Sequence, residues 1–175
     1  MDSAHGKSIY VSVGSGVTSS YPNIAFLTNS AGTKYVWEGD LYFEDASVSS
    51  SRVELVGTEK SSLFSTIGGT LKLYSAGLSQ NAGQLESGRW YHFRADIDTD
   101  YQTFDFYWDG EQKASKLPLE KDASDLKEIR LFCNFQGNYV LDNVLLKTVV
   151  EEPYITGVTY NGKDTPCLLY TSRCV

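Results

Sequence analysis

Three carboxylates in one short segment are the first candidates for chemistry in this chain. Residues 37–44, WEGDLYFE, contain the pattern E-x-D-x-x-x-E, and the period of two of a β-strand would place Glu38, Asp40 and Glu44 on one face. Paired carboxylates about 5 Å apart cleave glycosidic bonds, because one attacks the sugar while the other donates a proton to the leaving group. The pattern therefore offers a catalytic alternative, which competes with a solvated sheet face.

A second set of side chains suits the binding of a sugar. In residues 89–98, Tyr91 and Phe93 alternate with Trp90, His92 and Arg94, so the latter three share the face opposite the core. We predict a ligand-binding surface in which aromatic rings stack on sugars and the polar groups bond to hydroxyls. Its expected residues are Tyr42, Trp90, His92, Arg94 and Tyr107.

Strands must position both sets, because the chain alternates apolar and polar residues with period two. The predicted strands are residues 8–13, 34–45, 51–58, 62–67, 70–75, 89–98, 104–108, 127–135 and 138–148, with a further strand after the Asp109-Gly110 turn. Residues 76–88 are expected to form a long polar loop, and residues 122–126 one helical turn. This pattern predicts an all-β fold, an antiparallel sandwich of two sheets.

Composition narrows the partners and cofactors. The chain of 175 residues has a formal charge of -7, and its Lys and Arg residues are scattered, so we expect no nucleic-acid partner. No long apolar run or export leader is present, which predicts no membrane insertion. We expect no metal site and no cofactor, since no His/Cys cluster or phosphate loop occurs. Asp142 and Asn143 are the candidate ligands for a structural Ca²⁺.

The two ends differ from the body of the chain. We predict one domain over residues 1–150, then a linker and the start of a truncated, immunoglobulin-like module over 151–166. Residues 167–175 are interpreted as a non-native tail, because CLLYTS resembles one reading frame of a transposon end used to prepare sequencing libraries. Two of the three Cys residues lie there, and Cys133 is expected to be a small buried apolar residue.

The order of several motifs resembles the concanavalin A-like, laminin G-like jelly rolls of bacterial secreted multidomain proteins. The motifs are Gly88-Arg89-Trp90-Tyr91, Phe104 to Gly110, and Tyr139-Val140-Leu141-Asp142-Asn143-Val144. The resemblance covers residues 5–150 and implies a jelly-roll sandwich, here in a metagenomic gene fragment. It also implies a first strand beside the last one, which we expect to be missing from this chain, leaving an exposed edge.

The same resemblance implies two enzymatic alternatives. In laminarinase-like and carrageenase-like glycosidases, the matching strand would make Glu38 the nucleophile, Asp40 its helper and Glu44 the acid/base. In alginate lyase-like jelly rolls, His92, Arg94, Tyr42 and Tyr107 would supply part of the site, although the Gln-x-His strand of those enzymes is missing. Only three Trp residues occur, too few to wall a sugar cleft, so we favour a domain without catalytic activity.

The preferred hypothesis is a non-catalytic carbohydrate-binding or adhesion module of a larger extracellular or cell-surface protein. Its partners would be a polysaccharide or glycan and the other domains of that protein. A structural spacer, in which Trp90 only packs under a loop, is the alternative from a different functional class.

Overall fold

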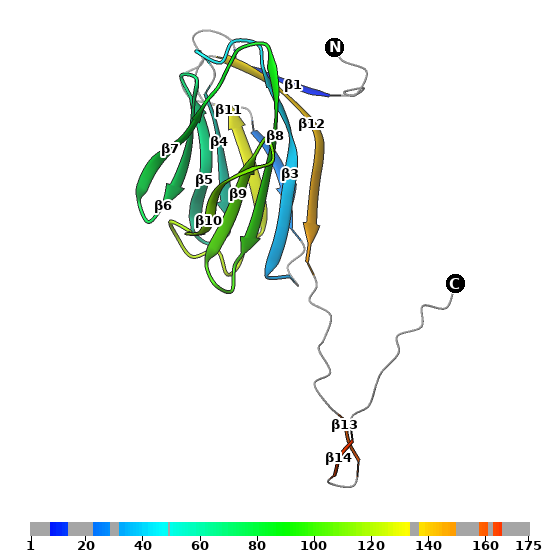
Figure 1. Ribbon diagram of the computed structural model, residues 1–175. Helices are drawn as coiled ribbons and strands as arrows, with labels where there is room; N and C mark the ends of the chain where they lie inside the picture. Colours follow the sequence, from blue (N-terminus) through cyan, green and yellow to red (C-terminus); the bar gives the residue numbers. More distant parts are fainter. Residues whose placement is uncertain are drawn as a thin grey trace, which may run out of the picture.

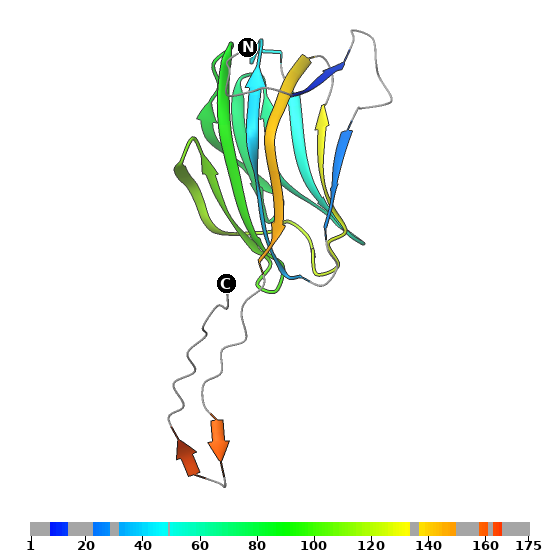
Figure 2. The same cartoon turned by 90° about the vertical axis from the view of Figure 1, so that its right-hand side faces the viewer.

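Two antiparallel sheets of six strands each lie face to face in the computed structural model (Figure 1, Figure 2). The structure describes residues 8–13, 23–28, 32–48, 50–133 and 137–149, and two short strands at 158–160 and 163–165. Every strand pairing within the two sheets is antiparallel. The predicted all-β antiparallel sandwich is therefore confirmed.

The first sheet, sheet A, carries the residues predicted to bind a ligand. Its strands in spatial order are β1 (Ile9–Val13), β12 (Gly137–Thr148), β3 (Lys34–Phe43), β8 (Arg89–Asp98), β9 (Thr103–Trp108) and β10 (Glu111–Pro118). Sheet B contains β2 (Asn23–Leu27), β11 (Glu128–Cys133), β4 (Ser50–Val56), β5 (Lys60–Ile67), β6 (Thr70–Ser75) and β7 (Leu78–Gln84), also in spatial order.

The core lies between the two sheets and is rich in aromatic rings. Trp37 from β3 is fully buried, and its ring centroid lies 4.5 Å from that of Phe93 on β8 and 6.2 Å from that of Phe64 on β5. Phe64 also contacts Phe106 of β9, at 4.9 Å. Offset and tilted ring pairs of this kind add to the burial of their apolar area, so the core holds sheet A rigidly against sheet B.

Alternation along the strands gives sheet A one buried and one outer face. In β8, Tyr91, Phe93, Ala95 and Ile97 are buried, whereas Trp90, His92, Arg94 and Asp96 are half-buried or exposed. β9 follows the same rule, and β3 follows it from Trp37 to Phe43, as the sequence predicted. We call the side of sheet A that faces away from sheet B the outer face.

Three expectations about the strands were wrong. The predicted loop at residues 76–88 contains β7, which pairs with β6 from Leu78 opposite Ser75 to Gln84 opposite Thr70. β2 was not predicted, although it pairs along β11. The edge strand expected to be missing is present, because β1 pairs with β12 from Ile9 opposite Leu141 to Val13 opposite Gly137.

Turns connect the strands as their residue types require. Asp109 and Gly110 both have positive φ, 51° and 78°, and join β9 to β10 in the predicted tight hairpin. At the predicted helical turn, Leu126 N donates to the carbonyl of Ala123 at 3.1 Å and closes a single turn.

Outside the sandwich, β13 (Val158–Tyr160) pairs with β14 (Lys163–Thr165) as a separate two-stranded sheet. These strands fall within the predicted module start at 151–166, whose immunoglobulin-like identity stays a prediction. The predicted tail at 167–175 and the side chain of Cys133 lie outside the described residues.

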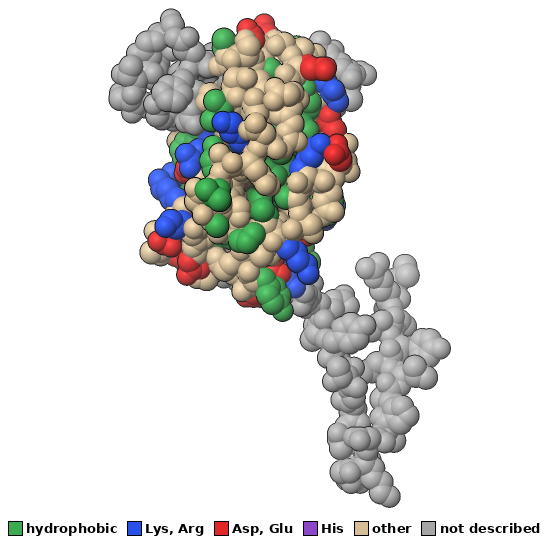
Figure 3. Space-filling model, turned by 60° about the vertical axis from the view of Figure 1, so that its left-hand side comes forward, with side chains coloured by type: hydrophobic (Ala, Val, Ile, Leu, Met, Phe, Trp, Pro, Cys, Tyr) green, Lys and Arg blue, Asp and Glu red, His purple; other side chains and the backbone are tan. Residues whose placement is uncertain are grey.

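The surface of the sandwich carries mixed charge. On the face shown in Figure 3, basic and acidic side chains are interspersed around hydrophobic side chains near its middle. The part of the chain that the structure describes contains no helix long and apolar enough to cross a membrane.

Candidate functional site

The five predicted ligand-binding residues lie together on the outer face of sheet A. Tyr42 comes from β3, Tyr107 from β9, and the other three from β8, which runs between those strands. Tyr42 is directly opposite Trp90 in the strand register, and Arg94 is directly opposite Tyr107. These five residues, Tyr42, Trp90, His92, Arg94 and Tyr107, are called the outer row below.

An aromatic pair forms one end of the outer row. The ring centroids of Tyr42 and Trp90 are 5.3 Å apart, with an angle of 44° between the ring planes. Both side chains are half-buried, so each presents part of its ring to solvent. Cross-strand aromatic pairs stabilise a sheet, and the same rings offer an apolar surface to the C–H face of a sugar.

His92 is held in the middle of the outer row by a carboxylate on the neighbouring strand. Its Nδ1 lies 2.7 Å from Oδ1 of Asp40, directly opposite in the register. The side chain of His92 is 48% exposed and that of Asp40 only 16%. Because a carboxylate can only accept, Nδ1 donates this hydrogen bond, which leaves Nε2 for other contacts.

Asp40 has a second donor on the other side. Asn143 of β12 donates from Nδ2 to Oδ2 of Asp40, at 2.7 Å. Asn143 lies at a bulge, where the register of β12 against β3 shifts between Asp142 and Leu145, and it has a positive φ of 50°. The bulge thus directs the Asn143 side chain to the carboxylate that orients His92.

Asp142 and Asn143, the candidate calcium ligands, are tied into this network. One carboxylate oxygen of Asp142 accepts from the backbone N–H of Asn143 at 2.7 Å, and the other accepts from Ser8 Oγ at 3.2 Å. Among the described residues, no three His, Cys, Asp or Glu side chains are grouped to hold a metal ion. The calcium role stays a prediction.

Arg94 is bound to an acidic partner on its own strand. Its Nε and Nη2 donate to the two carboxylate oxygens of Asp96, at 2.8 Å and 3.0 Å, and its guanidinium lies 5.8 Å from the ring centroid of Tyr107. The hydrogen bonds that Arg94 donates to Asp96, together with the nearby negative charge of Glu38, raise the pKa of Arg94. A shallow hollow beside this group is lined by Glu38, His92, Arg94, Tyr107 and Gly110.

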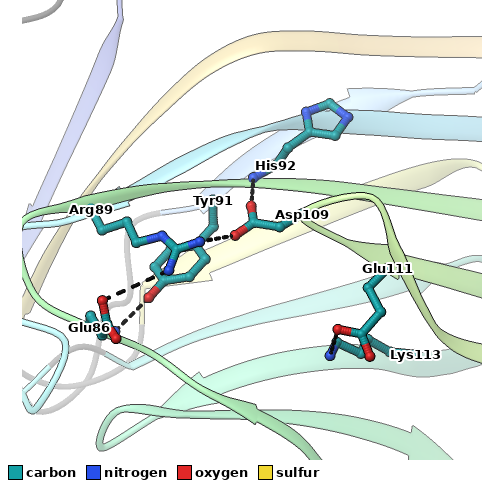
Figure 4. Close-up of polar contacts among 7 residues, drawn as sticks. All are labelled: Glu86, Arg89, Tyr91, His92, Asp109, Glu111 and Lys113. Atoms are coloured by element: carbon teal, nitrogen blue, oxygen red, sulfur yellow. Dashed lines mark hydrogen bonds and ion pairs between the residues drawn. The ribbon is translucent and has the colours of Figure 1, made fainter.

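The β9–β10 turn supports the backbone beneath His92. Asp109 accepts from the His92 backbone N–H at 2.9 Å and from Arg89 Nη2 at 2.6 Å (Figure 4). The close-up shows the His92 imidazole pointing away from Asp109. His92 is therefore held at two points, with Asp109 binding its backbone and Asp40 binding its imidazole.

The three predicted catalytic carboxylates are not brought together. Glu38 and Asp40 share the outer face, but Glu44 follows the end of β3 and is exposed. An extended strand rises about 3.3 Å per residue, so the α-carbons of Glu38 and Glu44 are roughly 20 Å apart. That distance far exceeds the separation of paired carboxylates in retaining and inverting glycosidases.

Sequence reasoning missed the residues that hold the outer row in place. Asp96 was not identified as the partner of Arg94, and Asp109 was interpreted only as a turn residue. The contact from Asn143 to Asp40 depends on a bulge, for which the sequence has no clear signal. The sequence did contain an indication of the Arg94–Asp96 pair, because two opposite charges at positions i and i+2 of a strand lie on the same face.

Comparisons with known proteins identify the fold. No protein family matches the sequence, and no curated protein is similar to it. Among solved structures, a sialidase superposes with a TM-score of 0.66 at 13% identity, covering 73% of this chain and 14% of its own. An alginate lyase, AlgAT5 of polysaccharide lyase family 7, gives 0.56 at 11% identity, covering 82% and 78%.

A third solved structure, the SAP-like pentraxin from Limulus polyphemus, gives a TM-score of 0.51 at 9% identity, covering 81% of this chain and 77% of its own. Together these similarities show that the sandwich has a jelly-roll fold. The chain spans 14% of the length of the sialidase but matches most of the lyase and of the pentraxin. At these identities the likeness concerns the fold alone.

Proposed function

We propose that this domain is a non-catalytic carbohydrate-binding or adhesion module. The observation that carries the proposal is the outer row, in which three aromatic rings and two polar donors lie on the same face of the neighbouring strands β3, β8 and β9. Sugar rings have apolar C–H faces and polar edges, so a ligand could stack on Trp90 and Tyr42 while its hydroxyls bond to His92 and Arg94.

The solved structures support a carbohydrate-related role. The sialidase and the alginate lyase carry names that refer to glycans and polysaccharides, and their jelly rolls share this fold. We further propose that the natural protein is extracellular or at the cell surface, and that other domains accompany this one. Sequencing the parent gene in both directions would test that context directly.

A glycan array followed by titration calorimetry tests the binding function. The intact chain should bind at least one polysaccharide, and Trp90→Ala should weaken that binding at least about tenfold, since loss of a stacked ring removes one to several kcal/mol. Circular dichroism and thermal unfolding of Trp90→Ala check that the fold survives.

Tyr74→Ala is the matched control variant. Tyr74 is half-buried on sheet B, and the guanidinium of Arg52 lies 5.2 Å from its ring centroid, an arrangement like that of Arg94 and Tyr107. This control should bind as the original chain does. If the original chain binds no glycan, the proposal fails and the structural spacer becomes the better description.

One observation favours a second candidate, a polysaccharide lyase. The hydrogen bond from His92 Nδ1 to Asp40 leaves Nε2 available to act as a general base, and Tyr107 lies on β9, two strands away from Asp40 on β3. Release of unsaturated sugars from alginate or pectate, measured by ultraviolet absorbance, would support it. No release by the original chain would leave the binding module as the better proposal.

The glycosidase alternative has less support, because Glu38 lies within β3 and Glu44 follows the end of that strand, far from Glu38. Assays of reducing ends with β-glucans and carrageenans address it. Hydrolysis that Glu38→Gln abolishes would replace the binding proposal with a catalytic one.

A further inference from the structure

The charges around the outer row restrict the kind of sugar that can bind there. On the outer faces of β3, β8 and β9, five carboxylates stand beside only two permanent cations, Lys34 and Arg94. The carboxylates are those of Glu38, Asp40, Asp96, Asp98 and Asp105. All five are half-buried, so they are close to any ligand that lies on these strands.

Both permanent cations already have carboxylate partners. Arg94 is bound through two nitrogens to Asp96, and Lys34 Nζ lies 3.7 Å from Asp98. A sugar carboxylate that approached Arg94 would have to displace Asp96 from a bidentate pair, the strongest geometry for this contact. It would also meet Glu38, which lines the same hollow as Arg94.

Like charges also face each other across the strands. Asp96 of β8 is directly opposite Asp105 of β9, and the two share a second hollow with Asp98 and Lys116. Asp105 accepts from the backbone N–H of Lys116, at 2.8 Å. The face therefore has hydrogen-bond acceptors in excess, which suits sugar hydroxyls as donors and repels an anionic ligand.

We propose that the outer row binds uncharged saccharides and excludes acidic ones such as uronates and sialylated glycans. This inference rests on the proposed carbohydrate-binding function, and it names the class of ligand. The proposed ligands therefore differ from the acidic sugars to which the names of the sialidase and the alginate lyase refer.

Matched pairs of polysaccharides test the inference with the full chain. The pairs are hydroxyethyl against carboxymethyl cellulose, methyl-esterified against free polygalacturonate, and propylene glycol alginate against alginate. For every backbone that binds, the neutral form should bind at least about tenfold more tightly at low ionic strength. The difference should shrink in 0.5 M salt, because salt screens the repulsion.

Asp96→Asn separates the electrostatic cause from other causes of selectivity. This change frees Arg94 and removes one negative charge, so the preference for the neutral form should fall several-fold. Glu54→Gln is the control, because Glu54 pairs with Arg52 on sheet B at 3.3 Å, and it should leave the preference unchanged.

Two results would overturn the inference, and they are distinguishable. Tighter binding to the acidic member of a pair would overturn the ligand class while leaving the carbohydrate-binding function standing. Failure to bind any of the six polymers or any glycan on the array would remove the binding function itself, and the inference with it.

Discussion

His92 Nδ1 and Asp40 Oδ1 lie 2.7 Å apart on neighbouring strands, and the other oxygen of Asp40 is bound by Asn143. This arrangement predicts the less usual tautomer for the neutral imidazole, with the proton on Nδ1, because the carboxylate cannot donate. Nitrogen chemical shifts from long-range ¹H–¹⁵N spectra, recorded at alkaline pH where an imidazole is neutral, distinguish the two tautomers.

Asp40→Ala should move His92 toward the Nε2-protonated form. Asp105→Ala is a suitable control, because Asp105 lies on the same face but accepts from Lys116. A predominantly Nε2-protonated ring in the unchanged protein would contradict the assigned contact.

The positive φ of Asn143 predicts unequal effects of two substitutions at the bulge. Asn143→Gly and Asn143→Ala both lose the hydrogen bond to Asp40, but only Ala pays for the left-handed backbone at φ 50°. Asn143→Ala should therefore be less stable than Asn143→Gly by about 1 kcal/mol. Urea unfolding of both variants measures the difference, and equal midpoints would show that the backbone relaxes at this position.

Truncation of Trp37 should destabilise the sandwich strongly. Its ring is fully buried between the sheets, with centroids 4.5 Å from Phe93 and 5.8 Å from Phe26. Trp37→Ala should lower the free energy of unfolding by about 3–5 kcal/mol, because a cavity replaces the indole. The control Tyr101→Ala, at a side chain that is 76% exposed, should change stability by less than about 0.5 kcal/mol.

Asp125 should make stability depend on pH in the acid range. Its carboxylate accepts from the backbone N–H of Thr58 at 3.0 Å and 2.8 Å and from the Thr58 hydroxyl, and these hydrogen bonds lower the pKa of Asp125. A lowered folded-state pKa contributes stability above the ordinary carboxyl value of about 3.9, and this contribution is lost as the pH falls through the folded-state pKa.

Melting temperatures of the original chain and of Asp125→Asn, compared from pH 7 to pH 2, test this expectation. The original chain should be slightly more stable at neutral pH, and the difference should vanish at the acid end. Asp100→Asn, at an exposed turn, serves as the control. A difference that grows on acidification would show that the assigned sign is wrong.

The sequence predicted those strands whose two faces differ in polarity. In β8 and β9, the buried residues Phe93 and Phe106 alternate with polar neighbours, so both strands and their inward faces were identified correctly. β7 has no such contrast, because Ser79, Gln80 and Asn81 are all exposed, and it was interpreted as a loop. Backbone pairing with β6, rather than burial of side chains, makes this segment a strand.

For the candidate site, the sequence predicted which residues share a face but not which residues contact each other across strands. The faces of β3 and β8 followed from alternation, which correctly grouped Tyr42 with Asp40, and Trp90 with His92. The pairing of Asp40 with His92 depends on the strand register, which one sequence does not determine. The contact of Asn143 needs both that register and the bulge.

The bulge at Asn143 also determines which side chains of β12 face inward. Before it, Tyr139 and Leu141 are buried, and after it Val144 and Leu146 pack against the core, so the inward positions change from odd to even numbers. Three residues of β12 span two residues of β3 here, so deleting residue 143 would remove the bulge and still leave Val144 and Leu146 on the inward face. The loss would fall on the outer face instead, where Asp40 would no longer accept from Asn143.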